Sequence, residues 1–395
     1  MKKMDYLEDA LGNQNDSAKR NKIFCAMIFV LCLRHVLQLL GASALASYLF
    51  IALYGLVSLF VIEAVFIKFS MKQSNMALFI FFAGAIAILF VFAYVMLRQR
   101  EHFEASLTFV LSFPLIICCD TISLSRKDSE MFFKLLTAIE VVLVALIFVP
   151  SSYKDGILLL YTPNANQAGL LYMSVFLAGY VYKFLNRKGM LGWLLLAGLL
   201  VGCWLTESRA AFASCIVCIL TSIIFSKKSH LNRKAMIVAV LLFIFIPMIA
   251  VMIFSNVDYS IKSLLNDAFT GRIAIWNTIF ENIEQNPISL NMDKVLADHY
   301  GEELGAHNVW LDIMWKYSLP VAVAFLAAMI YLCHHMSRSL TKKRTSVVSA
   351  CFVAAIVHMT FEAALIGGAL DYTLYFLVAI WSGIGIIDKG ETEHE

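Results

Sequence analysis

Long apolar runs follow one another along the chain, and short polar stretches separate them. Most runs reach or approach ~18 residues, the length that an α-helix needs to cross ~30 Å of hydrocarbon. Because the runs are continuous and do not alternate as barrel strands do, the pattern predicts helices. We expect about twelve spans, near residues 23–40, 44–67, 76–97, 105–124, 131–150, 166–185, 190–205, 209–226, 235–255, 318–336, 346–364 and 370–387.

The composition agrees with an all-α, polytopic membrane bundle. Apolar residues make up 61% of the chain and charged residues 15%, against roughly 45–50% and about 25% in soluble domains. A soluble globular protein is therefore excluded. The net charge of +3 adds little, and we expect no nucleic-acid partner.

Lysine and arginine are distributed unevenly between the two sides of this bundle. They gather before the first predicted span and after each even-numbered span, as in the Lys227-Lys228 pair. The positive-inside rule then predicts that both termini are cytoplasmic. The chain divides into a cytoplasmic tail, residues 1–22, and a single transmembrane domain, residues 23–395.

One hydrophilic segment, residues 256–306, is far longer than the other connections and lies on the outer side by the charge argument. A connection of ~50 residues in a compact protein usually has a function. Apolar positions at helical spacing predict a helix from Gly271 to Gln285, with Thr270 as its cap and Asn286-Pro287 as its end. A second amphipathic stretch follows at residues 308–317. We expect both helices to lie at the membrane interface, over the outer mouth of the bundle.

Two arginines on the outer side break the charge pattern and call for an explanation. Arg209 stands in the turn Thr206-Glu207-Ser208-Arg209, where it either pairs with Glu207 or provides a fixed cation for a phosphate. Arg272 opens the predicted loop helix, where it either pairs with Asp267 or adds to an anion site at the helix N-terminus.

His307 stands where the long loop returns to the membrane, and Asn308 follows it. Histidine is the side chain best suited to move a proton near neutral pH. Glu302 and Glu303 lie close enough in sequence to orient its ring. The alternative is a structural histidine, which an isolated position does not exclude.

Other polar residues in or near the spans have simpler interpretations beside the functional ones. Glu362 lies four residues after His358 in a predicted span, where ionisable groups are candidates for function. Pairing between helices is the simpler account, as it is for Lys134 with Glu140. Asn164 and Asn166, at the outer end of the 166–185 span, either cap that helix or contact substrate.

The sequence contains no phosphate-binding GxxxxGK[ST] loop, no HExxH and no paired acidic motif that would hold a metal for a nucleotide-sugar. We therefore expect neither a metal nor a cofactor.

Four segments together resemble the O-antigen ligase and polysaccharide polymerase family, the Wzy/WaaL-like membrane glycosyltransferases. They are Pro163-Asn164, Thr206-Glu207-Ser208-Arg209 with Ala210-Ala211, Gly271-Arg272 with Trp276, and Ala306-His307-Asn308 with Leu311. The motifs cover roughly residues 160–320. Family members often have glycine near position 318, where this sequence has Ser318.

The resemblance implies a helical bundle of the GT-C-like type and a transfer reaction on glycans linked to undecaprenyl diphosphate. Arg209 and Arg272 would bind the diphosphate, and His307 would activate the acceptor hydroxyl, in a metal-independent reaction that inverts the anomeric carbon. Substrate contacts would come from Asn164, Asn166, Ser208, Asn308 and Glu362. The expected location is the bacterial inner membrane, with the active site on the outer face and a flippase and a chain-length regulator as candidate partners.

Three functions stay open at this point. A polymerase would join one lipid-linked repeat unit to another, and we favour it because of the compact loop and the motif at Asn164. A ligase would transfer the glycan to lipid A-core. A polysaccharide flippase or other transporter is more remote, since no two-fold internal repeat is found.

Overall fold

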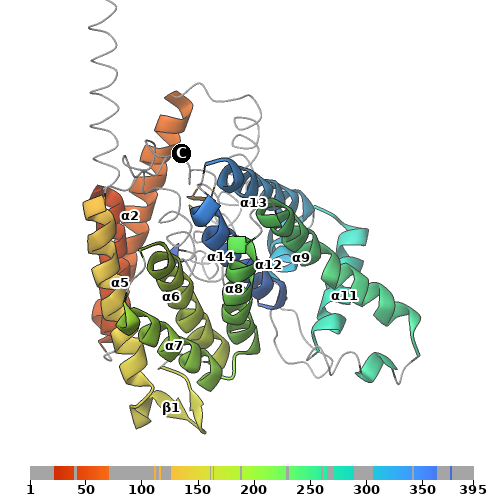
Figure 1. The fold of residues 1–395 in the computed structure, drawn as a ribbon. Helices are drawn as coiled ribbons and strands as arrows, with labels where there is room; N and C mark the ends of the chain where they lie inside the picture. Colours follow the sequence, from red (N-terminus) through yellow and green to blue (C-terminus); the bar gives the residue numbers. More distant parts are fainter. Residues whose placement is uncertain are drawn as a thin grey trace, which may run out of the picture.

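The computed structural model describes residues 22–39, 42–70, 126–160, 164–186, 189–227, 231–258, 261–264, 271–288, 306–339 and 342–362, with a few isolated positions besides. Within these residues the chain is almost entirely helical (Figure 1). The helices are Lys22–Leu39, α2 (Ser43–Ser70), α5 (Arg126–Leu146), α6 (Ala165–Asn186), α7 (Met190–Leu205), α8 (Arg209–Lys227), α9 (Leu231–Asn256), α11 (Arg272–Gln285), α12 (Val309–Tyr317), α13 (Leu319–Ser339) and α14 (Lys342–Phe361). The prediction of an all-α membrane protein is confirmed.

Several predicted spans match helices that are long and apolar enough to cross a membrane. These helices cover Lys22–Leu39, Ala44–Glu63, Ala165–Leu185, Arg209–Lys227 and Lys234–Asn256. Shorter apolar helices occupy Met190–Leu205, Leu319–His334 and Ser346–Phe361, where three more spans were expected. The predicted spans 76–97, 105–124 and 370–387 lie almost wholly outside the described residues, so the number of twelve stays a prediction.

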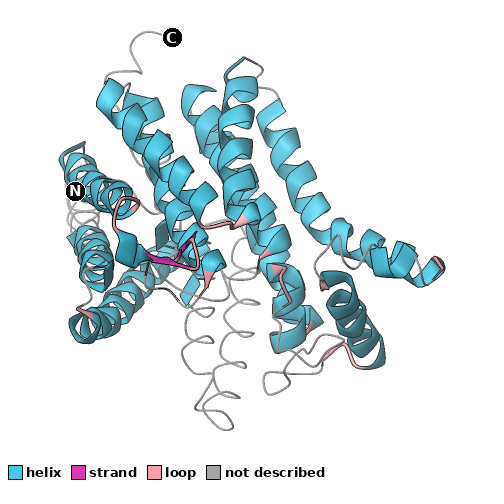
Figure 2. Cartoon of the chain, turned by 90° about the horizontal axis from the view of Figure 1, so that it is seen from below, coloured by secondary structure: helices cyan, strands magenta, loops and turns pink. Residues whose placement is uncertain are grey.

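α6 forms the centre of the bundle, because 89% of its apolar stretch is buried whereas the other long spans are 22–39% buried. It packs against α5, α7, α8 and α14, and α14 in turn packs closely against α8 and α9 (Figures 1 and 2). The outer faces of α2 and α9, which lie away from this centre, are apolar and exposed, as expected of helices that contact lipid.

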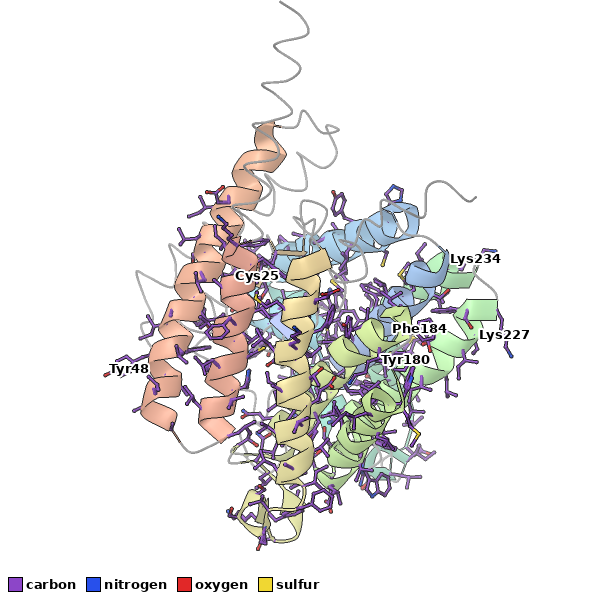
Figure 3. The ribbon with its side chains drawn as sticks, turned by 60° about the vertical axis from the view of Figure 1, so that its left-hand side comes forward. Cys25, Tyr48, Tyr180, Phe184, Lys227 and Lys234 are labelled. Atoms are coloured by element: carbon purple, nitrogen blue, oxygen red, sulfur yellow. The ribbon has the colours of Figure 1, made fainter. Side chains whose placement is uncertain are left out.

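Two basic residues of neighbouring helices lie at one end of the bundle. Lys227 ends α8 and Lys234 lies near the start of α9, so both lie at the same end of the bundle (Figure 3). The turn between α7 and α8 lies at the other end of α8. The arrangement therefore separates the basic connection from the Arg209 turn by the length of a helix.

Glycines allow helices of the bundle to approach closely, as small residues do in membrane proteins. A β-carbon on Gly202 of α7 would collide with the ring of Tyr172 on α6. That ring is fixed in turn, because the Tyr172 hydroxyl donates a 2.9 Å hydrogen bond to the Leu143 carbonyl of α5. One contact thus sets the spacing of three helices.

A buried ion pair joins α5 to α6, and it differs from the expected one. Glu140 pairs with Lys183, and both side chains are at most 3% exposed. The sequence favoured pairing of Glu140 with Lys134, but Lys134 is exposed and Glu140 faces the neighbouring helix. Lys134 and Glu140 do not pair because residues six apart on one helix do not share a face.

A short hairpin follows α5 and was not predicted. The turn η2 (Pro150–Ser152) leads into strands β1 (Tyr153–Lys154) and β2 (Ile157–Leu158), which pair antiparallel. Asp155 and Gly156 connect them with φ of 53° and 83°. Two such residues in succession form the two-residue turn that suits the twist of a hairpin.

α11 begins and ends as the sequence predicts, but its cap is different. Gly271, with φ of 78°, is the N-cap and provides no side-chain bond, so the expected Thr270 cap is wrong. Asn286 ends the helix as expected. One face, including Ile273 and Trp276, is buried in the protein.

α12 corresponds to the second predicted loop helix, but it does not lie exposed at the interface. Every residue of α12 except Lys316 is buried, and the helix packs against α11, α13 and α14. Lys316 pairs with Asp312 at 2.8 Å one turn earlier, and the carboxylate raises the pKa of this lysine. The amphipathic pattern of α12 therefore reflects packing of this helix within the protein.

Ser318, between α12 and α13, has φ of 92° and ψ of 162°, a region that essentially only glycine populates and that costs other residues about 1–3 kcal/mol. This explains why glycine is common near this position in the family that the sequence resembles. The strained residue also connects two parts of the fold, because the Leu319 N–H donates to the Pro287 carbonyl at 3.1 Å.

Ser318→Gly should raise the free energy of unfolding by about 1 kcal/mol, because relief of strain exceeds the entropy that glycine adds to the unfolded chain. The thermal midpoint of the purified protein measures this. Ser226→Gly, at an exposed helical position of α8, is the control and should lower the midpoint. A decrease of equal size in both variants would contradict the strain at Ser318.

Candidate functional site

The turn between α7 and α8 holds Arg209 in a fixed position at the start of α8. The Thr206 hydroxyl donates to the Cys203 carbonyl at 2.8 Å and accepts a 3.4 Å bond from the Ser208 N–H. Glu207 takes a left-handed conformation with φ of 58°. Ser208 is buried against Gly169 of α6, where a β-carbon would collide with it. The bonds of Thr206 and the contact of Ser208 with α6 therefore fix the turn, and Arg209 is exposed to solvent.

Arg272 is the first residue of α11 and lies close to the end of α14. Its Nη2 donates to Oε1 of Glu362 at 2.9 Å, with the two side chains 20% and 9% exposed. The left-handed Gly271 before it allows the chain to enter the helix sharply. Glu362 is the partner of Arg272 among the described residues, and Asp267, the alternative partner expected from the sequence, lies outside them.

His307 lies in the short connection before α12, where neighbouring bonds fix the backbone. The Trp276 indole donates to the Ala306 carbonyl at 2.8 Å. On the other side, the Asn308 amide donates to the Thr360 carbonyl at 3.1 Å, and its oxygen accepts from the Leu311 N–H at 3.0 Å. His307 itself has φ of 50°. Strained backbone of this kind is often found where a side chain must be aimed.

Glu362 contacts both Arg272 and His307. Its Oε2 lies 3.3 Å from Nδ1 of His307, while its Oε1 accepts from Arg272. With Glu362 ionised, Nδ1 carries the proton and donates it, which leaves the lone pair on Nε2. Nε2 has no partner within the described part of the chain. The sequence marked Glu362 as a candidate but did not indicate that it would contact His307, because 55 residues separate the two.

A cavity of about 350 Å³ opens beside this cluster. Its lining includes both arginines, Glu362 and other residues of α6, α8 and α14: Asn166, Glu207, Arg209, Ala210, Ala213, Arg272, Val357, Phe361 and Glu362. Segments far apart in sequence thus bring two guanidinium groups to one space. A second cavity of about 500 Å³ shares Glu207 and Arg209 with the first, so the two adjoin at the turn.

The remaining predicted residues differ in how near they lie to the cavity. Asn166 lines it. Ser208 lines the adjoining cavity, and its buried hydroxyl has no partner among the described residues. Asn164 caps α6 by accepting from the Gln167 N–H at 2.9 Å, the simpler of its two interpretations.

Asn308 is fully buried, and its amide is used within the protein. Its position suits a residue that orients His307 better than one that touches substrate. Glu207 lines both cavities but was not among the predicted site residues; its place beside Arg209 in the same motif was the available signal.

Other expectations about the site stay untested. Glu302 and Glu303, expected beside His307, lie outside the described residues. No ion pair joins Arg209 to Glu207 among the residues described. No cluster of three potential metal ligands is found in the same residues, and the absence of a metal stays a prediction.

Fold and site together define a helical membrane protein with two arginines and a carboxylate-bound histidine at one face. Residues 193–326, about a third of the chain, match the family model described as O-Antigen ligase. This match supports the assignment to the Wzy/WaaL-like family that the sequence motifs indicated. The matched region contains Arg209, Arg272 and His307. No curated protein and no solved structure matches the chain significantly.

Proposed function

We propose that the protein is a membrane glycosyltransferase that polymerises oligosaccharide repeat units linked to undecaprenyl diphosphate, at the outer face of a bacterial inner membrane. An O-antigen ligase or polymerase type of function follows from the family match. The single observation that carries the finer proposal is the convergence of Arg209 and Arg272 on one cavity next to the Glu362–His307 pair.

The cavity suits a diphosphate. Guanidinium groups are permanently charged and bind phosphate oxygens in a bidentate manner. A volume of about 350 Å³ lies within the ~300–1,000 Å³ of small-molecule sites. The two arginines would stabilise the charge that develops on the diphosphate as it leaves, so a separate general acid is not needed.

His307 would act as the base. Its Nε2 would take the proton of an acceptor hydroxyl while the oxygen of that hydroxyl attacks the anomeric carbon of the donor. The bond from that carbon to the diphosphate breaks, and lipid diphosphate leaves with the electron pair. Attack opposite to the leaving group inverts the anomeric carbon. Glu362 would orient the ring and stabilise the cationic imidazole, as carboxylates do in other His-dependent enzymes.

Location and partners follow from the same proposal. The cluster lies at the helix ends opposite to the basic α8–α9 connection, which agrees with an outer-face site under the positive-inside rule. A donor assembled inside the cell must reach that face, so a flippase is the partner class that the reaction requires. A chain-length regulator is a further proposed partner.

The ligase is the second candidate, and the matching family model, described as O-Antigen ligase, favours it. Purified protein given only lipid-linked repeat units should produce a ladder of longer lipid-linked glycans if it is a polymerase. A ligase should leave the donor unextended and should transfer it only after lipid A-core is added. Gel separation of the products distinguishes the two, and transfer only to lipid A-core would overturn the polymerase.

Glu362→Gln should lower kcat by about 10²-fold or more without weakening donor binding, because a neutral amide can donate to Nδ1 and favour the wrong tautomer of His307. His307→Ala should abolish transfer. Glu362→Asp, which keeps the charge, should recover part of the rate. Glu284→Gln, on the exposed far end of α11, is the matched control. Wild-type kcat in Glu362→Gln would refute the pairing as a catalytic feature.

Arg209→Gln and Arg272→Gln should each weaken donor binding by about 10- to 100-fold, since a charge-assisted hydrogen bond contributes about 1.5–3 kcal/mol. Lys154→Gln, an exposed cation on the hairpin, tests whether any positive charge at this face has the same effect. Binding of a fluorescent lipid diphosphate in detergent is the measurement. Equal losses in all three variants would replace the proposed clamp with general electrostatic attraction.

A further inference from the structure

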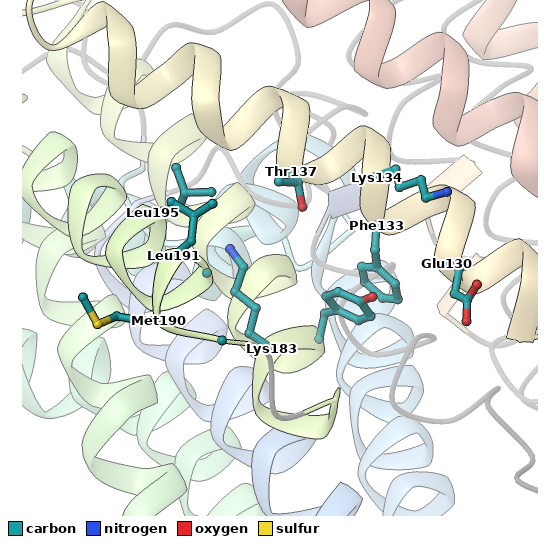
Figure 4. A pocket seen from close by; sticks show the side chains of 11 residues that line it. Glu130, Phe133, Lys134, Thr137, Lys183, Met190, Leu191 and Leu195 are labelled. Atoms are coloured by element: carbon teal, nitrogen blue, oxygen red, sulfur yellow. The ribbon is translucent and has the colours of Figure 1, made fainter.

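Among the buried lysine, histidine and acidic side chains that the structure describes, His358 differs from the rest because it has no hydrogen-bond partner. Lys183, on the wall of the cavity between α5, α6 and α7 (Figure 4), pairs with Glu140. His35 is bonded to the Leu31 carbonyl. Neither ring nitrogen of His358 has a partner among the described residues, although this residue is only 1% exposed. The proposed glycosyl transfer makes no use of His358.

His358 lies on α14, one helical turn before Glu362. The Glu362 N–H donates to the His358 carbonyl at 2.9 Å, so the helical hydrogen-bond pattern extends to Glu362. Side chains four residues apart in this pattern share one face and lie next to each other. The charge of Glu362 also acts on the His358 ring. His358 is therefore a neighbour of the carboxylate that contacts Arg272 and His307.

The two side chains are complementary in their capacity for hydrogen bonds. A neutral imidazole has one N–H donor, and a carboxylate has about four positions that accept. Arg272 and His307 occupy two of these positions on Glu362. A buried N–H without an acceptor is unfavourable, so a bond from His358 to a free position on Glu362 would stabilise the site. With Arg272 on Oε1, as in the structure, His358 does not form this bond.

A bound donor changes the partner of Arg272. The guanidinium lines the cavity of about 350 Å³, and a diphosphate there carries more negative charge than the carboxylate that Arg272 now contacts. When Arg272 binds the diphosphate, Oε1 of Glu362 loses its partner. Because Glu362 is 9% exposed, losing that bond is costly unless another donor replaces it. His358 has an unused donor one turn away on the same helix.

We propose that His358 is a positioning residue that donates a hydrogen bond to Glu362 when Arg272 engages the diphosphate of the donor. The new bond offsets the loss of the Arg272–Glu362 bond and keeps the carboxylate against His307 for the transfer step. Because it forms only with donor present, it strengthens donor binding. This inference rests on the proposed function, since it requires Arg272 to bind the diphosphate.

A double-mutant cycle, with binding of a fluorescent lipid diphosphate in detergent as the measurement, tests this exchange. His358→Phe keeps a ring but removes the donor, and it should weaken binding about 10-fold, the lower end of the effect of a hydrogen bond to a charged group. In the Arg272→Gln background Glu362 has no cation to lose, so adding His358→Phe should leave binding unchanged. His358→Gln retains an N–H donor and should recover most of the affinity.

Equal weakening by His358→Phe in both backgrounds would show a structural effect and overturn the exchange. Wild-type affinity in His358→Phe, while Arg272→Gln alone binds weakly, would also overturn the exchange but leave the diphosphate clamp intact. Wild-type affinity in Arg272→Gln alone would refute the clamp itself, and the exchange with it.

Thermal stability without donor separates a positioning role from a purely structural one. The His358 ring has no partner among the described residues of the donor-free protein, so His358→Phe should not lower the thermal midpoint. His334→Phe, the same change at a half-buried position of α13, is the matched control and should leave binding of the lipid diphosphate unchanged. A lower midpoint in His358→Phe together with unchanged donor affinity would make His358 a structural residue only.

Discussion

The Glu362 carboxylate holds together parts of the site that the chain supplies from three separate places. One oxygen accepts from Arg272 at the start of α11, and the other lies against His307 just before α12. Glu362 directly follows α14, which packs on α8 and α9. A carboxylate that is 9% exposed is stable there because both oxygens have partners, whereas one left without them would carry a large desolvation cost. The loop that contains Arg272 and His307 is thereby attached to the membrane bundle.

The same constraint explains why the surrounding backbone is rigid. A histidine 3.3 Å from a shared carboxylate keeps that geometry only if its own position is fixed. Trp276 and Asn308 provide this, because each bonds to the backbone on one side of His307. On the opposite side of the cavity, the close approach of Gly169 to Ser208 fixes the turn that ends at Arg209. Helix packing, and not the loop alone, therefore sets the site.

Much of this could be predicted from the sequence, since hydrophobic runs and the positions of Lys and Arg are local signals. The limits of α7 and α11 and the residues Arg209, Arg272 and His307 were indicated in this way, and the proposed roles of the three residues come from the family resemblance. The Glu362–His307 contact and the Glu140–Lys183 pair were not, because they join residues 55 and 43 positions apart and depend on tertiary packing. The burial of α12 was missed for the same reason: an apolar helix face does not reveal whether lipid or protein covers it. The left-handed Ser318 breaks a local preference that sequence patterns assume.

Glu362 contacts both Arg272, which would hold the donor, and His307, which would activate the acceptor. This shared carboxylate has a consequence for the proposed reaction. Without donor, Arg272 neutralises part of the charge on Glu362. When a diphosphate enters the cavity, it competes for the same guanidinium, and the negative charge of Glu362 becomes more available to His307. The imidazolium that forms during transfer would then be better stabilised when donor is bound than when the site is empty. Activation of the acceptor would then be coupled to the presence of donor, and this coupling would follow from the geometry of one residue.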